Sequence, residues 1–408
     1  MTQQLEGKDS SLWIATTPRT NYPSLSGDDT TYDLAVVGGG ITGVMAVYFA
    51  QLRGLKAVLI EKNRLVEWTT GGTTAKLSSQ HYLIYDFLIK RHGKEVAQAY
   101  ADANEKGIDK IESLAKELSI DCDFSRRSAY VYSADTTKVN DVKAEVDAAL
   151  QLGLPASFET STDLPFSVTA AIKFSDQAQF HPRKFLLGLV DRFVQNGGVV
   201  YENTKATDIT AGDPNIVVTE QGNIKAKNIL QASGEAFWGG EIFDDYMWMK
   251  MSYALAVSLK DPKAYPENMY ITTDKPMRTI RTADYKGQPV MIFGGESHEL
   301  DNDNFDPDRH YKNLIDDVHR KFDVDKILFR WLAGDYMPYD RIPYIGAMPT
   351  NRSIFTITGY RAWGLAWAVS ATQAIIDDVS GKPAKWVKPF ELDRLSQPLT
   401  KDDKITGF

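Results

Sequence analysis

Cysteine is nearly absent from this chain of 408 residues, which contains only Cys122. One cysteine cannot form an internal disulfide, and it cannot hold an iron–sulfur cluster or a structural zinc ion. We therefore expect a cytoplasmic protein in a reducing environment, without a metal site.

Long apolar runs and clusters of basic residues are missing as well. No run of 18 apolar residues occurs, and residues 1–10 lack the features of a secretory signal, so we expect no integral membrane segment. The formal net charge of −8 and the scattered Lys and Arg residues argue against a nucleic-acid partner. With 43% hydrophobic and 25% charged residues, the composition is typical of a globular protein, and the length favours two lobes.

A strand, a glycine-rich turn, a helix and a second strand are predicted over residues 31–62. A buried parallel strand at 32–37 is followed by Gly38, Gly40 and Gly43 in the pattern G-x-G-x-x-G. The first glycine permits a tight turn, the second lets the backbone approach a pyrophosphate, and the third lets the helix pack on the strand. The helix N-terminus, with Ile41 and Thr42, offers free N–H groups to phosphates.

An acidic residue closes the second strand of this unit. Glu61, which is followed by Lys62, lies 23 residues after Gly38, where a carboxylate can accept hydrogen bonds from ribose hydroxyls. The pattern predicts an α/β protein with a Rossmann-type dinucleotide-binding domain. By itself, this unit does not distinguish FAD from NAD.

Small residues over 69–80 come directly after the second strand, and here the chain resembles the D-amino-acid oxidase, glycine oxidase and sarcosine oxidase superfamily. In that family such a loop lies along the pyrophosphate and the isoalloxazine, so the resemblance implies FAD. It continues through residues 179–182, 202–207, 232–234, 340–346 and 359–365, and it implies that the last block places a helix N-terminus near the flavin. The cofactor-binding residues that it implies beyond the βαβ unit are Gly72, Thr73, Thr74, Ala75, Ala206, Ser233, Gly234, Gly359, Gly364 and Leu365.

The resemblance implies two interleaved domains. We expect an N-terminal arm over 1–30 and a discontinuous FAD-binding domain of 31–85, 175–237 and 332–408. An α+β substrate domain of 86–174 and 238–331 would be built on a mixed β-sheet.

A closer resemblance is to a branch that often carries a C-terminal Rieske domain, through residues 11–14, 73–76, 281–282 and 363–364. The chain contains no Cys-x-His and Cys-x-x-His pairs, so we expect that domain to be absent. The electron acceptor is then either oxygen or an unidentified redox partner. The family attaches flavin covalently through Cys or His, and neither Cys122 nor His81 matches the attachment positions, so we expect non-covalent FAD.

The active-site prediction rests on departures from the family pattern. Amino-acid-oxidising members hold the substrate carboxylate with arginines, and their positions fall here on Asp335 and Ala362, with Arg361 next to the second. An acid at this place favours a cationic substrate, unless Asp335 merely pairs with an Arg or caps a turn. The candidate pocket residues are Tyr253, His298, Trp331, Tyr336 and Trp363, of which His298 is the best titratable candidate, and core packing is the alternative reading of each of them.

These observations predict an FAD-dependent oxidoreductase that oxidises a C–N bond of an amine or amino-acid-like substrate by hydride transfer to flavin N5. Two alternatives stay open. One is a dehydrogenase that passes electrons to a separate protein or quinone, and the other is a flavin-binding protein without catalysis.

Overall fold

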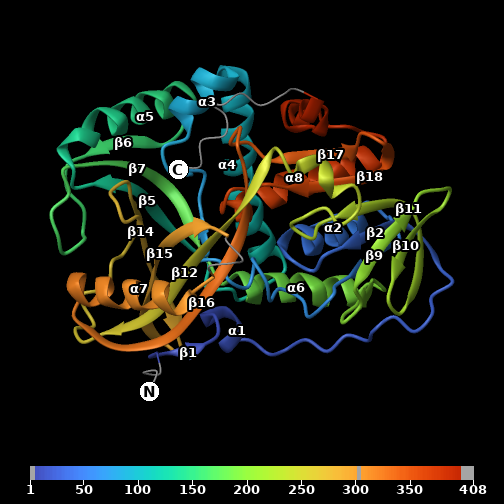
Figure 1. Ribbon diagram of the computed structural model, residues 1–408, viewed down its shortest axis with the longest axis horizontal. Helices are drawn as coiled ribbons and strands as arrows, with labels where there is room; N and C mark the ends of the chain where they lie inside the picture. The colour runs from blue at the N-terminus through green and yellow to red at the C-terminus, as the bar shows by residue number, and fades with distance from the viewer. Residues whose placement is uncertain (1–4, 301–304, 397–408) are drawn as a thin grey trace.

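Two β-sheets lie side by side in the computed structural model, which describes residues 5–300 and 305–396 (Figure 1). Helices pack around both sheets, and the chain crosses between the two lobes several times. The predicted fold class, a Rossmann-type lobe interleaved with an α+β lobe on a mixed sheet, is confirmed by this arrangement. Over the described residues, no helix combines the length and apolar character needed to cross a membrane.

The smaller sheet carries the predicted βαβ unit at its centre. Its strand order is β17-β18-β11-β2-β3-β8, and neighbours from β18 to β8 are parallel. Because α2 packs on β2 and β3, the apolar side chains of both strands are buried, as expected for a parallel sheet. The strands are β2 (Thr31–Val37), β3 (Ala57–Ile60), β8 (Val199–Tyr201), β9 (Ala206–Thr210), β10 (Asn215–Thr219), β11 (Gly222–Gln231), β17 (Tyr344–Met348) and β18 (Asn351–Thr358).

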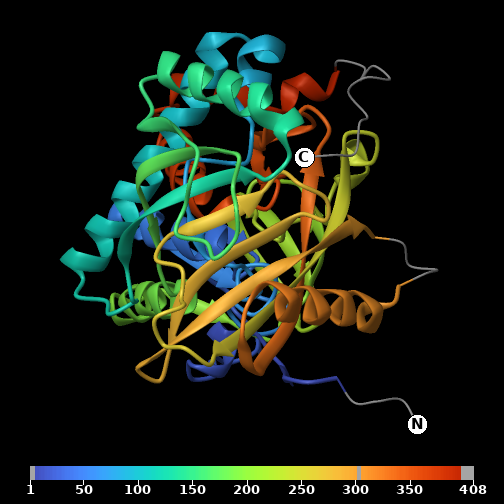
Figure 2. The same ribbon diagram turned by 90° about the vertical axis from the view of Figure 1, so that its left-hand side faces the viewer.

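The larger sheet is mixed and strongly curved (Figure 2). Its order is β1-β16-β12-β15-β14-β13-β5-β7-β4, with β6 paired to β7. The longest pairing, between β12 and β16, is antiparallel and brings residue 250 opposite residue 335. The strands are β1 (Lys8–Asp9), β4 (Lys76–Leu77), β5 (Ser125–Ser133), β6 (Ala156–Glu159), β7 (Ala170–Gln179), β12 (Met247–Leu259), β13 (Met269–Thr272), β14 (Arg278–Tyr285), β15 (Gln288–Glu299) and β16 (Val324–Pro338).

Helices α4 and α8 join the two lobes. Their backbones approach closely at Gly107, where an added Cβ would lie 2.2 Å from the carbonyl oxygen of Ala366. Tyr100 and Trp367 pack edge to face beside this contact, with ring centroids 4.9 Å apart. The helices are α1 (Leu12–Ala15), α2 (Ile41–Leu52), α3 (Tyr85–His92), α4 (Lys94–Glu117), α5 (Val139–Gln151), α6 (Pro182–Gln195), α7 (Pro307–Lys321) and α8 (Gly364–Val379).

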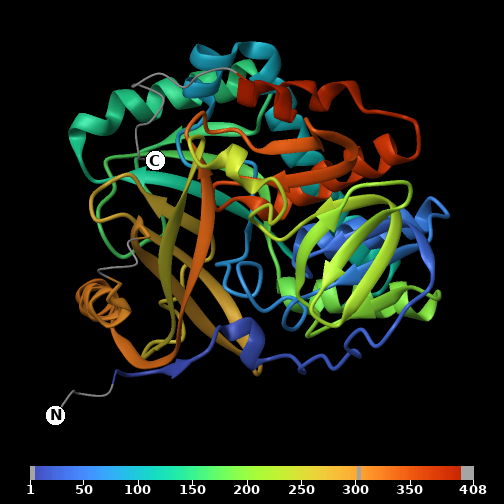
Figure 3. The same cartoon turned by 45° about the vertical axis from the view of Figure 1, so that its right-hand side comes forward.

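The N-terminal arm crosses the molecule from the larger sheet to the smaller lobe (Figure 3). It starts with β1, which pairs with β16, and continues into the short helix α1, capped by Ser11. Leu12 and Trp13 are fully buried, whereas Ile14 is only partly buried. Burial of two apolar residues fixes the start of the arm against the body of the protein.

The sequence did not reveal helix α7. It packs on β12, β15 and β16, and it directly follows residues 301–304, which lie outside the described residues. The expected domain boundaries after residues 174 and 331 fall inside β7 and β16. We propose instead that the lobes divide according to sheet membership, because a strand cannot leave its sheet halfway.

Candidate active site

A cavity of about 630 Å³ lies where the two sheets meet, at the carboxyl ends of β2, β11 and β18. Ligands of open α/β sheets bind at this edge, because loops and helix N-termini converge there. One part of the wall comes from the smaller sheet and the loops that follow it, and we call it the cofactor half. The other part is carried by the larger sheet, and we call it the substrate half.

The glycines of the cofactor half have the geometry that a dinucleotide cradle needs. An added Cβ on Gly38, whose φ is +116°, would lie 2.4 Å from the carbonyl oxygen of Ala232. On Gly43 it would lie 1.8 Å from the carbonyl oxygen of Gly38, which is where the helix packs on the strand. Helix α2 begins after Gly40, and its first amide, that of Ile41, donates to the hydroxyl of Thr70 at 3.1 Å; Gly40, Ile41 and Thr42 line the cavity, so the helix N-terminus lies at the cavity wall.

Glu61 is held in place at the edge of this cradle. One carboxylate oxygen accepts a hydrogen bond of 2.7 Å from the Gly39 amide, and the other accepts one of 2.8 Å from the Asn63 amide. Burial raises the pKa of Glu61 above its ordinary value, although both amides oppose this shift. Each oxygen keeps lone-pair capacity for a ribose hydroxyl, so the site fits the adenosine part of FAD.

The small-residue loop after β3 is fastened from two sides. The indole N–H of Trp13 donates to the carbonyl of Thr73 at 2.6 Å, and that of Trp331 donates to the carbonyl of Gly72 at 2.8 Å. Ala75 has a φ of +59°, a conformation that a side chain disfavours and that the surrounding contacts must hold. Thr73 and its neighbour Thr74 thus present a rigid backbone to the cavity.

The closing block forms the opposite wall. Gly359 has a φ of +76°, and an added Cβ would lie 2.4 Å from the ring of Pro338. Helix α8 then begins at Gly364 without a side-chain cap, so its N-terminus faces the cavity. Arg361 does not line the cavity: it is buried, burial lowers its pKa to about 10, and its neighbours Ala362 and Trp363 face the cavity instead.

Lys250 and Asp335 face each other on the substrate half, as register partners on β12 and β16. Burial lowers the pKa of Lys250 and raises that of Asp335, while the charge of each residue opposes the shift of the other. Asp335 therefore carries its own counter-charge. The argument for a cationic substrate rested on this carboxylate alone, and the facing lysine adds a group of opposite charge.

Lys76 lies on the same wall and has different surroundings. Its ammonium donates to the carbonyl of Tyr270 at 3.2 Å and to the hydroxyl of Thr279, and it lies 5.4 Å from the ring centroid of Trp363. Among the described residues, no carboxylate forms an ion pair with it. Burial lowers its pKa to about 7. The substrate half therefore has a surplus cation that faces the cavity.

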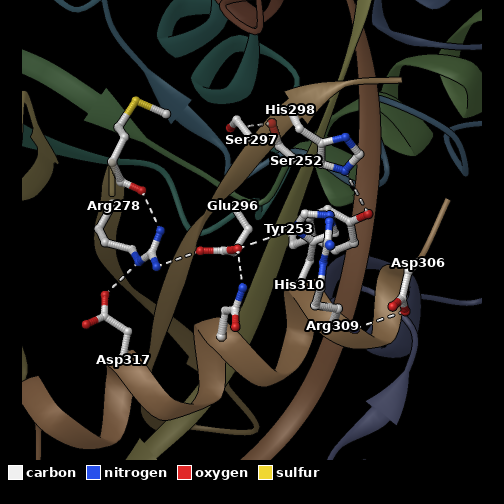
Figure 4. A network of polar contacts seen from close by, with 12 residues as sticks. Ser252, Tyr253, Arg278, Glu296, Ser297, His298, Asp306, Arg309, His310 and Asp317 are labelled. Atoms are coloured by element: carbon white, nitrogen blue, oxygen red, sulfur yellow. Dashed lines mark hydrogen bonds and ion pairs between the residues drawn. The ribbon is translucent and has the colours of Figure 1, made fainter. Parts of the chain in front are cut away.

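His298 does not line the cavity and lies instead on the face of the larger sheet that α7 covers, grouped with Tyr253 and His310 (Figure 4). The Tyr253 hydroxyl lies 3.2 Å from Nε2 of His298, and the imidazole stacks on that of His310 at 4.2 Å. Because Nδ1 of His298 lies 2.7 Å from the backbone carbonyl of Glu299, it carries the proton, and Nε2 accepts from Tyr253. The Tyr253 ring also stacks on His310 of α7, so the side chains of both Tyr253 and His298 face α7 rather than the cavity.

A β-bulge shapes this part of the wall. Between Met251 and Tyr253, the single residue Ser252 of β12 faces two residues of β15, Glu296 and Ser297. Glu296 turns away from the cavity and pairs with the buried Arg278 at 2.8 Å, as Figure 4 shows. The bulge leaves the hydroxyls of Ser252 and Ser297 in contact at 2.9 Å on the cavity side.

Most predicted site residues meet at this cavity. Gly43, Ala75, His298 and Arg361 do not line it. The sequence did not predict that Lys76 is a binding group, because it lies in the loop of residues 69–80, which the resemblance assigns to flavin contacts. It gave no indication of Lys250. The predicted residues that line the cavity are Gly38, Gly40, Ile41, Thr42, Glu61, Lys62, Gly72, Thr73, Thr74, Ala206, Ser233, Gly234, Asp335, Gly359, Trp363, Gly364 and Leu365.

Comparison with solved structures finds the same fold. Glycine oxidase from Geobacillus kaustophilus superposes with a TM-score of 0.77 over 91% of this chain and 100% of that chain, at 17% identity. L-proline dehydrogenase from P. horikoshii gives a TM-score of 0.73 over 92% and 99%, at 15% identity.

Sequence comparison identifies relatives over most of the length. A Bacillus subtilis protein named as a putative Rieske 2Fe-2S iron-sulfur protein, YhfW, is 34% identical over 94% of this chain and 75% of its own length. Gamma-glutamylputrescine oxidoreductase from Escherichia coli is 24% identical over 86% and 84%. The profile of the family described as "DAO: FAD dependent oxidoreductase" matches residues 33–377. With these matches and the cradle of Gly38, Gly43 and Glu61, the chain belongs to the DAO family of FAD-dependent oxidoreductases.

Proposed function

We propose that the protein oxidises the C–N bond of an amine that also carries a carboxylate, with Lys76 holding the carboxylate. The observation that carries this proposal is the surplus cation of the substrate half: Lys250 faces Asp335, whereas Lys76 has no acidic partner among the described residues. A charged ligand group can supply the missing partner, and an ammonium–carboxylate hydrogen bond in a closed cavity is strong.

The flavin supplies the redox chemistry, since it accepts the hydride equivalent from the carbon next to nitrogen when bound. The protein has to place the substrate and exclude water. Trp363, which lies next to the Lys76 ammonium and immediately precedes helix α8, provides an aromatic wall.

Further support comes from the kinds of protein that this chain resembles. Glycine oxidase and L-proline dehydrogenase are named for amino acids, and gamma-glutamylputrescine oxidoreductase is named for an amine conjugate of glutamate. The sequence predicts cationic amines or amine conjugates from Asp335 alone; we prefer an amine that also carries a carboxylate, because Lys250 faces Asp335. We also propose that FAD is bound non-covalently, since the cavity wall formed by the described residues contains no Cys or His.

The test is anaerobic stopped-flow reduction of the flavin with matched pairs of amines. We expect glycine, β-alanine or γ-aminobutyrate, whichever is best, to reduce the flavin at least about tenfold more efficiently than 1,4-diaminobutane, in line with a charged hydrogen bond. Lys76→Met should remove this preference and leave the FAD content unchanged. Faster reduction by the diamine, or an unchanged preference in Lys76→Met, would contradict the proposal.

The same experiment addresses the alternatives. A flavin that no amine bleaches would support the non-catalytic reading. Admission of air to the reduced protein then separates an oxidase, which recovers its flavin colour within turnover time, from a dehydrogenase, which stays reduced until a quinone or a redox protein is added.

A further inference from the structure

A second cavity, of about 420 Å³, lies on the larger lobe and shares no residue with the first. It is bounded by α1, the ends of β5 and β7, and the hairpin of β14 and β15. Arg281 lies in its wall and is only 3% exposed. A buried side chain of this charge calls for an explanation, because desolvation destabilises a cation when nothing compensates it.

The surroundings of Arg281 compensate it incompletely. Its Nη1 donates to the carbonyl of Ala75, and the guanidinium lies 5.2 Å from the ring centroid of Trp13. Its Nε is buried and donates to no acceptor, and no carboxylate forms an ion pair with it within the described parts of the chain. Burial lowers the pKa of Arg281 to about 9. The wall of this cavity therefore contains one N–H donor without an acceptor and one positive charge without an ion-pair partner among the described residues.

A second unsatisfied group faces the same cavity. Oε1 of Gln179, on β7, is buried and accepts no hydrogen bond. Buried polar atoms without partners are rare, and an acceptor and a cationic donor in one cavity match a ligand that has both an anionic and an N–H group. Gln179 is also the register partner of Lys76 on β4, so it lies directly behind the first cavity.

Acidic residues set the charge at the outside of the cavity. Asp123, Glu267 and Asp284 line it and are exposed, whereas Arg281 is buried; Asp123 pairs with Lys184 at 2.9 Å, and the exposed Arg127 also lines the cavity. Among the described residues, Glu267 and Asp284 form no ion pair, so these two carboxylates outnumber Arg127 at the outside of the cavity and favour an ammonium group there over a phosphate or a sulfate. The arrangement of a buried cation below exposed carboxylates is thus complementary to a zwitterion.

We propose that this second cavity binds a small zwitterionic amino compound, whose carboxylate contacts the Arg281 guanidinium and whose ammonium donates to Gln179 and faces the exposed carboxylates. Trp13 and Arg281 both line the cavity. They donate hydrogen bonds to the carbonyls of Thr73 and Ala75 in the small-residue loop after β3. A ligand on Arg281 therefore acts on the segment that ends in Lys76, and occupancy of the second cavity changes substrate affinity at the first.

The test is anaerobic calorimetry on the FAD-loaded full chain, with the flavin absorbance recorded in parallel to report the first cavity. Glycine is the ligand, and acetate, sulfate and glycine betaine, a zwitterion without N–H, are the controls. Lys76→Met disables the first cavity, and Gln179→Leu removes the acceptor in the second. We expect glycine to bind the second cavity of Lys76→Met with the same affinity as the second cavity of the native chain. In Gln179→Leu, its affinity for the second cavity should be about tenfold lower.

Two outcomes would overturn the proposal. The first is that Lys76→Met abolishes glycine binding, with no heat detected, while Gln179→Leu leaves it unchanged. The second is that acetate, sulfate or glycine betaine binds Lys76→Met as tightly as glycine does. Two different measurements test this proposal and the proposed function. Flavin bleaching by an amine reports on the first cavity, whereas the heat of glycine binding to Lys76→Met reports on the second. Retained FAD absorbance in Gln179→Leu shows that the variant is folded.

Discussion

The two halves of the first cavity are built in different ways. The cofactor half comes mainly from one contiguous βαβ unit, in which Gly38, Gly43 and Glu61 lie within 24 residues. The substrate half is assembled from strands of the larger sheet, so that Lys76, Lys250 and Asp335 meet from distant parts of the chain. Backbone geometry therefore dominates the first half and side-chain charge dominates the second, and substitutions in each should fail in different ways.

The largest effect is expected from Gly43→Val in the cofactor half. The new side chain would meet the carbonyl oxygen of Gly38, a backbone atom that cannot move without unseating β2 from α2. We expect a loss of more than about 4 kcal/mol of stability, with a protein that is colourless or insoluble. Gly240→Ala is the control, since its Cβ would meet only a methyl at 3.8 Å. A yellow, stable Gly43→Val protein would show that the helix does not pack on the strand at this point.

Next in size is Lys250→Met in the substrate half. It leaves Asp335 as a buried carboxylate without its facing cation, at a cost of about 3 kcal/mol or more. The double variant Lys250→Met/Asp335→Leu should recover most of this loss, because an apolar pair replaces both charges. Urea unfolding of the two variants measures the difference. Additive losses in the double variant would mean that the two residues do not act as a pair.

Glu61→Ala should weaken FAD binding by about 1.5–3 kcal/mol, the value of hydrogen bonds to a charged group. Titration of apo-protein with FAD measures the dissociation constant. Glu61→Gln keeps a carbonyl acceptor and should lose less. If both variants bind FAD as the native chain does, the ribose is held elsewhere.

The smallest effect concerns pH and sharpens the contrast between the two lysines. Burial lowers the pKa of Lys76 to about 7, so its charge is present below pH 7 and lost above it. Acetate, which has no amine, should therefore bind the first cavity about fivefold more weakly at pH 8 than at pH 7, judged by its effect on the flavin spectrum. The rate of flavin reduction by an amine should rise with pH instead, because the reacting amine must lose its proton. Lys76→Met should show no such loss of acetate binding.

The sequence alone was sufficient for the family, the cofactor and the order of the elements around residues 31–62. Local patterns encode these features: an alternation of buried strand, glycine turn and apolar helix needs only short-range information. It was insufficient for helix α7 and for the partner of Asp335. A carboxylate in a strand has no visible partner in sequence, because the register of β12 on β16 is set by the pairing of two segments about 85 residues apart.

What the sequence determined by itself is therefore the dinucleotide cradle, since the steric demands of Gly38, Gly40 and Gly43 act within one turn of chain. Only the tertiary structure decided the charge of the substrate half and the place of Arg281. Whether a buried charge has a partner depends on which strands become neighbours, and the long-range pairing of a mixed sheet brings Lys250 to Asp335 while it leaves Lys76 and Arg281 without a carboxylate among the described residues.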